Sequence, residues 1–387
     1  MKAVAVFPEA REVKIVEQEE PRINAPTEVK LRVLEVGVCG TDKEICAFEY
    51  GTPPLGSPFL VLGHESLSEV VETGDAVSRL KVGDLVVASV RRPCPHDTCA
   101  ACRMGRQDFC FTGDFTERGI KEQHGYMTEF VVDDERYMNV LPAHLREVGV
   151  LIEPLTIAEK ALTQVWQVQQ RLPWEVPMPG SGQKPAAPGV AAQTGAGGTQ
   201  EWLHHRALVL GAGPVGLLGA MALSVAGFDT HVYSREGATS DKARLVEAFG
   251  AKYLSAETHT VEGLAEAVGG LDLVYEAVGA SSLAFEVMKF LDTNGVFVFT
   301  GVPGRKAPVA VDTDLLMRNL VLRNQIAFGT VNAGRDAFEA AIRDLDIFNT
   351  RWPQVVKSLI TARVPIEQHR DLLLGKAGGI KNVVKLA

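Results

Sequence analysis

The stretch Gly211-Ala-Gly213-Pro214-Val215-Gly216 constrains the fold of this chain more than any other feature of its sequence. It follows an apolar run, RALVL, that is typical of a buried strand, and it opens an apolar run that is typical of a helix. Such glycines allow a tight turn, close approach of a phosphate to the backbone, and close packing of the helix on the strand. Because a helix N-terminus favours anions, we predict a dinucleotide site at Gly211, Gly213, Pro214, Val215 and Gly216.

The segments after this turn alternate between strand-like and helix-like patterns. THVYSR, LDLVYEAVG and GVFVFTG are typical of strands, whereas PVGLLGAMALSVAG and KARLVEAFG are typical of helices. Strands that alternate with helices indicate a doubly wound parallel sheet. We therefore predict a Rossmann dinucleotide-binding domain over residues 204–332.

The first part of the chain has a different pattern. Apolar and polar residues alternate in VAVF, VKIVE and VKLRVLEV, and strand-like runs return at LSEVVET and GDLVVASV. A helix is predicted at IEPLTIAEKALTQVWQVQQ, and Pro, Gly, Ala and Ser then dominate residues 172–203, which indicates a loop or linker. A chain of 387 residues is too long for one ordinary core. The expected fold class is α/β, a β-rich domain combined with the Rossmann domain.

The end of the second Rossmann strand, Ser234-Arg235-Glu236, bears on the choice of cofactor. An NAD enzyme would place an acid there for the ribose hydroxyls. Ser234 occupies that place, and Arg235 could pair with a 2′-phosphate. This favours NADP, while Glu236, one residue later, leaves NAD possible.

Four of the six cysteines lie within one short segment, CPHDTCAACRMGRQDFC. Four thiolates in one lobe are typical of tetrahedral zinc with no open coordination position. We therefore predict a structural zinc site rather than a catalytic one. Its ligands are Cys94, Cys99, Cys102 and Cys110.

A second set of metal-ligand types is scattered along the chain. Cys39 follows a strand in GVCGTDKEI, His64 and Glu65 lie in LGHES, and Glu153 lies in IEPL. A thiolate, an imidazole and a carboxylate can hold catalytic zinc with one position open. Each residue is a weak signal when it is taken alone.

Composition and charge exclude several classes of protein. The net charge is −9, and no basic helix follows the cysteines, which disfavours a nucleic-acid partner. The uncharged run at residues 207–228 contains the glycine-rich turn and suits a strand and buried helix better than a membrane span. The charged N-terminus is no secretory signal. We expect a cytoplasmic protein without membrane contact.

In their order along the chain, GVCGTD, GHE, the four-cysteine lobe and GAGPVG resemble the zinc-dependent medium-chain dehydrogenases. The runs GRQDFC, TGDF, ERGI and EPLTIAEK are similar to the archaeal-type glucose 1-dehydrogenase branch of that superfamily. The resemblance implies a GroES-like catalytic domain, residues 1–171 and 333–387, with the zinc lobe at about 91–111. The Rossmann domain would be inserted within it.

The resemblance also implies roles for individual residues. Catalytic zinc would be held by Cys39, His64 and Glu65, with Glu153 near or on the metal. Thr41 would contact the substrate and relay its proton, while Asp114, Glu153 and Asn332 would bind sugar hydroxyls. The cofactor would be lined by the glycine-rich turn and by Ser234, Arg235, Glu236, Ala277, Val278, Gly279, Thr330, Val331 and Asn332.

The implied activity is oxidation of an aldose at C1 to its lactone, with NADP or NAD as hydride acceptor and two zinc ions per chain. A polyol or secondary-alcohol dehydrogenase is the alternative, because it would share the zinc and cofactor geometry. Several sugar hydroxyls need several partners, and Asp114, Glu153 and Asn332 supply them. A non-catalytic nucleotide-binding zinc protein is a more distant alternative. The family also implies a homo-oligomer, either a dimer or a tetramer.

Overall fold

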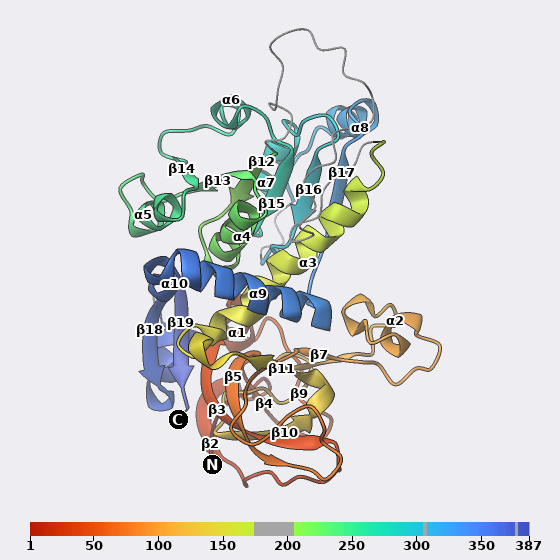
Figure 1. The fold of residues 1–387 in the computed structure, drawn as a ribbon, viewed down its shortest axis with the longest axis vertical. Coiled ribbons are helices and arrows are strands. Elements are labelled where there is room, and N and C mark those ends of the chain that lie inside the picture. The colour runs from red at the N-terminus through yellow and green to blue at the C-terminus, as the bar shows by residue number, and fades with distance from the viewer. Residues whose placement is uncertain (174–204, 305–307, 376–377, 387) are drawn as a thin grey trace. The chain divides into compact units, whose positions relative to one another are not determined.

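A computed structural model describes residues 1–173, 205–304, 308–375 and 378–386 (Figure 1). The chain divides into two compact units, Met1–Thr156 with Asn332–Ala387 and Ile157–Val331. The change of unit falls inside α3 (Ile152–Gln169) and not after residue 171. The end of α3 belongs to the second unit, where Gln169 Nε2 donates to the Asn294 carbonyl at 3.0 Å. Most of the expected linker, residues 174–203, lies outside the described residues.

The second unit is built on a six-stranded sheet whose neighbouring strands all pair in parallel. The strand order β14-β13-β12-β15-β16-β17 is that of a doubly wound dinucleotide-binding fold. The expected Rossmann sheet is therefore confirmed. Its strands are β12 (Arg206–Leu210), β13 (Asp229–Ser234), β14 (Lys252–Ser255), β15 (Leu273–Glu276), β16 (Val296–Phe299) and β17 (Ile326–Gly329).

Helices alternate with these strands. They are α4 (Pro214–Val225), α5 (Asp241–Ala248), α6 (Leu264–Val268), α7 (Ser281–Met288) and α8 (Thr313–Leu322). Central strands of such a sheet are covered on both faces, and the side chains of Leu208, Val274 and Phe297 are accordingly fully buried. None of the helices in the described ranges is long and apolar enough to cross a lipid bilayer.

The first unit contains a seven-stranded sheet in the order β11-β6-β5-β3-β19-β18, with β10 also paired to β3. The chain's last strand, β19, pairs antiparallel with β3, so the C-terminus completes the N-terminal sheet. The strands are β3 (Glu28–Val38), β5 (Glu65–Thr73), β6 (Leu85–Ala88), β10 (Phe130–Asp134), β11 (Met138–Leu141), β18 (Ile360–Pro365) and β19 (Lys381–Lys385).

The first unit also contains two three-stranded sheets. One contains β1 (Lys2–Phe7), β2 (Glu12–Glu17) and β4 (Leu60–Val61), and the other contains β7 (Arg91–Arg92), β8 (Thr116–Arg118) and β9 (Glu122–Gln123). The helices are α1 (Gly40–Cys46), α2 (Ala100–Arg103), α9 (Arg335–Arg351), α10 (Pro353–Leu359) and α11 (His369–Leu373). Short 3-10 helices are η1 (Gln107–Phe109), η2 (Glu135–Tyr137), η3 (Ala143–Leu145), η4 (Gly149–Leu151) and η6 (Ile366–Gln368).

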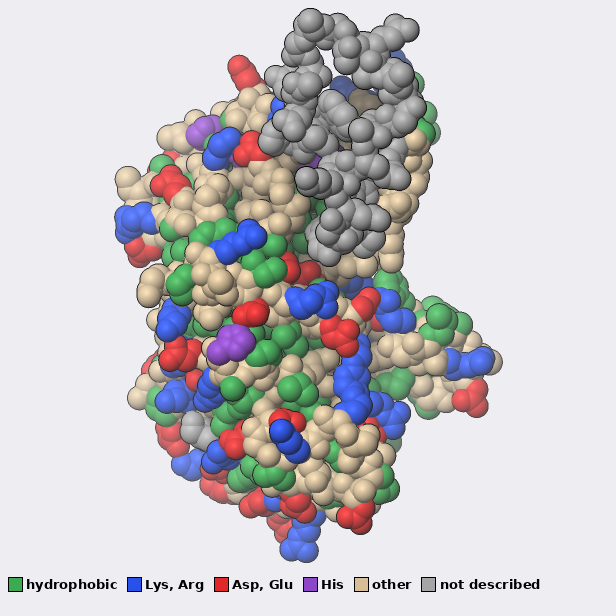
Figure 2. Space-filling model, viewed as in Figure 1, with side chains coloured by type: hydrophobic (Ala, Val, Ile, Leu, Met, Phe, Trp, Pro, Cys, Tyr) green, Lys and Arg blue, Asp and Glu red, His purple; other side chains and the backbone are tan. Residues whose placement is uncertain are grey.

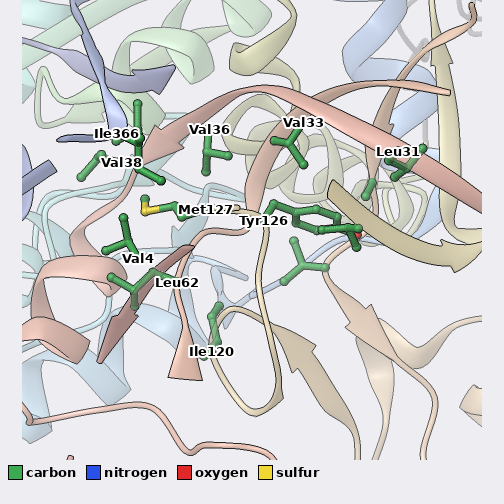
Figure 3. Close-up of a cluster of buried hydrophobic side chains, with 14 of the residues drawn as sticks. Val4, Leu31, Val33, Val36, Val38, Leu62, Ile120, Tyr126, Met127 and Ile366 are labelled. Carbon is green, nitrogen blue, oxygen red and sulfur yellow. The ribbon is translucent and has the colours of Figure 1, made fainter. Parts of the chain in front are cut away.

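The core of the first unit lies between its sheets (Figure 3). Leu31, Val33 and Val36 of β3 are fully buried there, in the same cluster as Val4 of β1 and Met127. The alternation in VKLRVLEV places Val29, Leu31 and Val33 in this core. The pairing of β3 with β5 shifts register between Val33 and Glu35, and Val36 beyond the shift is buried in the same core. This packing fixes the end of β3, which carries the first candidate ligand, Cys39.

Candidate active site

Three of the predicted catalytic ligands come together in the first unit. Candidate ligand atoms of Cys39, His64 and Glu65 all lie within 4.8 Å of one another. Cys39 lies between β3 and α1, while His64 and Glu65 stand at the start of β5. Because β3 and β5 pair side by side, a thiol, an imidazole and a carboxylate that are distant in sequence form one group, with the donor set of a zinc site.

The Cys39 backbone is fixed by the helix that follows it. Cys39 is the N-cap of α1, and its N–H donates to Asp42 Oδ2 at 2.8 Å. An acidic residue at this position of the first turn satisfies a donor of the chain entering the helix. The hydroxyl oxygen of Thr41 lies 3.9 Å from Cys39 Sγ, so Thr41 stands beside the metal group as the resemblance implies.

His64 is buried beside the same carboxylate. Its Nδ1 lies 3.6 Å from Asp42 Oδ1, and Asp42 is fully buried. Burial lowers the pKa of the His64 imidazole, but the charge of Asp42 outweighs it and raises that pKa well above its ordinary value. A carboxylate behind an imidazole orients the ring and strengthens it as a ligand. Asp42 is therefore a supporting residue of the group.

Glu65 faces Gly37 across β3 and β5. A Cβ at Gly37 would lie 2.1 Å from Glu65 Oε2, so a larger residue there would push this carboxylate from its position beside Lys381. Both oxygens of Glu65 accept from the Lys381 ammonium, at 2.7 and 2.5 Å, and that ammonium also donates to the Val38 carbonyl at 3.2 Å. Lys381 is 1% exposed, and it supplies the counter-charge that a buried carboxylate needs.

Glu153 stands in the first turn of α3 and is buried. Burial raises the pKa of its carboxyl group to about 7, and the nearby charges of His64, Glu65, Lys381 and Asp42 act on it as well. Glu153 therefore lies within electrostatic range of the metal group. It is not one of the three residues whose ligand atoms lie within 4.8 Å of one another.

The four lobe cysteines form the second candidate metal site. Sulfur atoms of Cys94, Cys99, Cys102 and Cys110 lie within 4.8 Å of one another, and none of the four is in a disulfide. Burial raises the pKa of the Cys110 thiol, but the Thr112 hydroxyl and the backbone N–H groups of Thr112 and Gly113 lower it to about 6. Burial raises the pKa of the Cys102 thiol to about 12, so the four sulfurs do not share one protonation state without a metal. Four sulfur ligands close a tetrahedral site, and the site stays a candidate for structural zinc.

Asp114 lies on the loop that leaves this lobe. Its carboxylate pairs with His96 Nε2, and both side chains are exposed. Its backbone N–H donates to the Thr112 hydroxyl at 3.3 Å. Asp114 is thus held by the lobe, and no contact in the described ranges joins it to Cys39, His64 or Glu65. Asn332 contacts a different residue, Glu117, whose carboxylate accepts from Asn332 Nδ2 at 2.9 Å.

The glycine-rich turn of the second unit has the geometry of a phosphate-binding loop. Gly211 has φ of 103°, a left-handed conformation that favours glycine. A Cβ at Gly216 would lie 2.1 Å from the Gly211 carbonyl oxygen, so that glycine permits the close approach of turn and helix. A Cβ at Gly213 would meet nothing within 4 Å. The space in front of the N-terminus of α4 is therefore open, as an approaching pyrophosphate requires.

The predicted ribose-binding residues follow β13. The Ser234 hydroxyl donates to Glu236, and Lys242 of α5 donates to the other oxygen of that carboxylate at 2.5 Å. Burial raises the pKa of Glu236, but the bonds from Lys242 and Ser234 lower it to about 2. Arg235 is exposed. Glu236 is thus ionised and held by Lys242, while Arg235 extends from the same turn.

The remaining predicted cofactor residues are also held by buried groups. Oε1 of Glu276 accepts from the backbone N–H groups of Val278 and Gly279, both at 2.7 Å. One carboxylate oxygen therefore fixes the backbone of both residues. The backbone N–H of Ala277 donates to the Leu210 carbonyl at 3.0 Å. Thr330 follows β17, and its backbone N–H donates to the Phe299 carbonyl at 3.0 Å. The Val331 carbonyl accepts from Lys160 Nζ at 3.0 Å.

Sequence reasoning missed four of the residues that support these groups. Asp42 had a local signal, because an acid three residues after an N-cap is typical of a capping box. Lys242 and Glu276 lie near the expected cofactor segments but match no motif. Lys381 had no signal, because it stands 316 positions from its partner, Glu65, in an ordinary-looking strand.

Comparison with protein families supports both units. Residues 25–143 match the model of the alcohol dehydrogenase GroES-like domain, and residues 186–386 match the model of the glucose dehydrogenase C-terminus. The glucose 1-dehydrogenase of Methanocella arvoryzae is 37% identical over 387 residues, covering 100% of this chain and 99% of that protein. The glucose 1-dehydrogenase of Thermoproteus tenax is 37% identical over 388 residues with the same coverage.

Comparison with solved structures points to the same family as the sequence comparison. The glucose dehydrogenase of Haloferax mediterranei, in complex with NADP, Zn and gluconolactone, has a TM-score of 0.84 and 30% identity over 100% of this chain and 99% of that one. Galactitol-1-phosphate dehydrogenase of Escherichia coli, at 18% identity and a TM-score of 0.75 over 100% of both chains, shares the fold. The chain therefore belongs to the glucose 1-dehydrogenase branch of the zinc-dependent medium-chain dehydrogenases.

Proposed function

We propose that this protein oxidises an aldose, with glucose the first candidate, at C1 to the lactone and transfers the hydride to NADP. The observation that carries this proposal is the convergence of Cys39, His64 and Glu65, with Lys381 and Asp42 behind them, in one buried group. The relatives named glucose 1-dehydrogenase and the Haloferax complex with NADP, Zn and gluconolactone support the substrate and cofactor.

The catalytic metal would be held by Cys39, His64 and Glu65, with Glu153 near or on it. The donor set fits zinc, because a thiolate, an imidazole and a carboxylate leave a position open. Zinc in such a site supplies Lewis acidity, which lowers the pKa of a bound hydroxyl. The buried partners Asp42 and Lys381 would hold the imidazole and the carboxylate in place.

Thr41 would carry the hydroxyl proton away from the site. Its hydroxyl oxygen is 3.9 Å from Cys39 Sγ and its side chain is half-buried, so it can contact both a substrate hydroxyl and solvent. In the overall reaction, the C1 hydroxyl loses a proton to solvent and C1 loses a hydride to the nicotinamide. The C1–H bond breaks and the C1=O bond of the lactone forms, which balances NADP reduction.

The other sugar hydroxyls would be bound by Asp114, Glu153 and Asn332. Asp114 would need to exchange His96 for a hydroxyl, because that carboxylate is paired with the lobe histidine. Glu153, whose pKa is raised to about 7, can serve as donor or acceptor near neutral pH. Asn332 projects from the segment after β17 and is held by Glu117.

NADP would be bound by the turn at Gly211–Gly216, by Ser234, Arg235 and Glu236, and by the segments 277–279 and 330–332. Arg235 is exposed, and Lys242 already neutralises Glu236. A 2′-phosphate would therefore meet two cations rather than an unpaired acid. NAD would use Glu236 for its ribose hydroxyls, so dual use is part of the proposal. Initial rates with the two cofactors at equal low concentration test it, and a strong preference for NAD would reject it.

The second zinc would be structural and held by Cys94, Cys99, Cys102 and Cys110. Four sulfurs leave no position for substrate. The lobe carries exposed Met104, Phe109 and Phe111 at its surface, and Figure 2 shows hydrophobic side chains on this projection. Bound zinc would stabilise the lobe, because a structural metal contributes folding free energy directly.

We also propose that the protein works in the cytoplasm as a homo-oligomer of two or four chains. The thiolates of both metal sites need a reducing compartment. In the described part of the sheet, β17 has no partner strand on its outer side, and α8, the helix that precedes β17 in sequence, exposes Met317, Val321 and Leu322. An open strand edge and exposed apolar side chains are each typical of an interface. Light scattering after gel filtration tests this, and a stable monomer would reject it.

A substrate panel tests the main proposal. Zinc-loaded protein would be offered glucose, other aldoses, sorbitol and a small secondary alcohol, each with NADP. We expect the highest kcat/KM with an aldose. Good rates on sorbitol or the small alcohol, together with failure on every aldose, would overturn the proposal in favour of a polyol or secondary-alcohol dehydrogenase.

A further inference from the structure

Glu276, the last residue of β15, is a buried carboxylate whose charge has no role in the chemistry above. It is 2% exposed. Its Oε1 accepts from the backbone N–H groups of Val278 and Gly279, and its Oε2 accepts from the N–H of Gly301 at 3.2 Å. Three N–H donors favour the ionised form of a carboxylate, which can only accept. Among the residues that the structure describes, no lysine, arginine or histidine is paired with it.

Two glycines let the loops after β15 and β16 pack closely beside this carboxylate. A Cβ at Gly301 would lie 2.1 Å from the Gly279 nitrogen and 2.8 Å from Glu276 Oε2. Gly279 has φ of 71°, and a Cβ there would lie 2.6 Å from the Val302 carbonyl oxygen. The two loops therefore meet backbone against backbone. Because Glu276 has almost no contact with water, its charge is screened less than that of an exposed group.

The order of the strands relates Glu276 to the predicted dinucleotide site. β12 lies between β13 and β15 in the sheet, and α4, whose N-terminus would take the pyrophosphate, follows β12. The predicted ribose residues 234–236 follow β13, so the adenosine half of the cofactor would lie on that side of β12. The nicotinamide half would then lie at the carboxyl ends of β15, β16 and β17, and Glu276 stands at the first of these ends.

Other buried charges lie on the same side of the site. Lys160 of α3 is 4% exposed and donates to the Val331 carbonyl at 3.0 Å. Burial raises the pKa of the Tyr275 phenol, the Thr300 hydroxyl lowers it, and the charges of Glu159 and Glu276 raise it further. Two carboxylates therefore act on one phenol here, and one ammonium opposes them. A substitution of Glu276 alone changes this balance by one charge.

We propose that the charge of Glu276 sets the redox preference of the bound cofactor: it favours the oxidised nicotinamide, which is a cation, over the reduced nicotinamide, which is neutral. A negative charge lowers the free energy of a nearby cation and has little effect on a neutral ring. This inference rests on the proposed function in one respect, that a nicotinamide dinucleotide binds at Gly211–Gly216. It applies to NADP and NAD alike, because they share the nicotinamide half. Glu276 does not touch the ring in this scheme.

The affinities for the two redox states test the inference without turnover. Calorimetry would give the Kd values for NADP and NADPH of the zinc-loaded wild type and of Glu276→Gln, in the absence of sugar. Gln keeps an oxygen for the N–H groups of Val278 and Gly279 but removes the charge. We expect the Kd for NADP to rise about tenfold relative to the Kd for NADPH. The lost bond to Gly301 would weaken the binding of both redox states alike, so the ratio of the two Kd values is the readout.

Two further variants separate the charge from the shape of the loops. Glu276→Asp keeps the charge, so its ratio of Kd values should stay within about twofold of the wild-type ratio even if both affinities fall. Glu266→Gln makes the same chemical change at an exposed glutamate of α6 in the same unit, and it should leave both Kd values unchanged.

Each outcome decides the matter. An unchanged ratio in Glu276→Gln would overturn the inference, while binding of NADP by the wild type upholds the proposed cofactor site. If Glu276→Gln does not fold, the 46% exposed Val278, whose N–H binds Glu276, decides. Val278→Asp should favour NADP over NADPH about threefold more than Val278→Asn does, and equal ratios would overturn the inference. NAD and NADH replace the pair if the wild type binds only those. A wild type that binds none of the dinucleotides would reject the proposed function, and the inference with it.

Discussion

Lys381, in the last strand of the chain, donates its ammonium to both carboxylate oxygens of Glu65, which stands 316 positions earlier at the start of β5. Both side chains are almost completely buried. The last strand of the chain, which pairs with β3 in the first sheet, therefore also supplies a residue to the surroundings of the candidate catalytic metal. Without this ammonium, both oxygens of the buried Glu65 carboxylate would lose the cation that they bind.

Replacing Lys381 should destabilise the metal-free protein. Lys381→Met leaves Glu65 unpaired, and the loss of one partner of a buried pair typically costs about 3–5 kcal/mol of unfolding free energy. Saturating zinc should restore more stability to this variant than to the wild type, because the metal then supplies the missing positive charge. Urea unfolding with and without zinc measures both effects.

Two controls belong to that experiment. Lys381→Arg keeps the charge and should lie between wild type and Lys381→Met. Lys385→Met removes an exposed lysine from the same strand and should change little. A metal-free Lys381→Met protein as stable as the wild type would show that Lys381 does not compensate Glu65.

The lobe cysteines should hold one zinc ion without taking part in turnover. Cys102→Ser should lower the zinc content from two ions per chain to one and make the lobe sensitive to protease, because the metal contributes its folding free energy. Metal analysis by mass spectrometry and limited proteolysis measure this. Cys46→Ala is the matched control, since Cys46 is a buried thiol outside both metal groups. Two zinc ions in Cys102→Ser would contradict the assignment.

The raised pKa of Glu153 predicts a pH dependence of stability. Its folded-state pKa of about 7 lies above the ordinary value of 4.5. The folded metal-free protein therefore binds this proton more tightly than the unfolded chain, and stability from this group falls as pH rises from 4.5 to 7. Glu153→Gln should remove that fall and be the more stable protein at pH 8. Urea unfolding of both proteins from pH 4 to pH 8 measures this. A difference in unfolding free energy that stays constant over this pH range would contradict the prediction.

Asp133 predicts the opposite dependence. Burial raises the pKa of its carboxyl group, but Arg118 and Arg92 outweigh burial and lower it below the ordinary 3.8. Its contribution to stability is thus present above that pH and is lost as pH falls through the folded-state value. Asp133→Asn leaves buried Arg92 unpaired and should cost about 3–5 kcal/mol at pH 7. Urea unfolding should show this difference shrinking below pH 3.8, and a constant difference would refute the cause.

The fold could largely be predicted because its signals are local. The glycine turn at Gly211–Gly216 and the alternation after it predicted β12, α4 and β13 with the correct order of elements. Each of these signals lies within one strand or helix and the turn beside it. The antiparallel pairing of β19 with β3 had no such signal, since the register of distant strands is set by packing.

The candidate site could be predicted only in part, because some of its contacts join residues that are distant in sequence. Cys39 and the pair His64 and Glu65 stand in short motifs, whereas the bonds from Lys381 to Glu65 and from Asn332 to Glu117 join residues separated by 316 and 215 positions. Nothing near these residues in the sequence shows that they will meet. The supporting residues of the site therefore required the structure.

Transfer of deuterium from C1-deuterated glucose tests the central claim most directly. Zinc-loaded protein would be incubated with [1-²H]glucose and NADP, and the reduced cofactor and sugar product analysed by mass spectrometry. We expect one deuterium in each NADPH and an equal amount of gluconolactone or gluconate. Cys39→Ala, which should retain the lobe zinc, should form neither. NADPH without deuterium, or undiminished transfer by Cys39→Ala with one zinc per chain, would contradict the account.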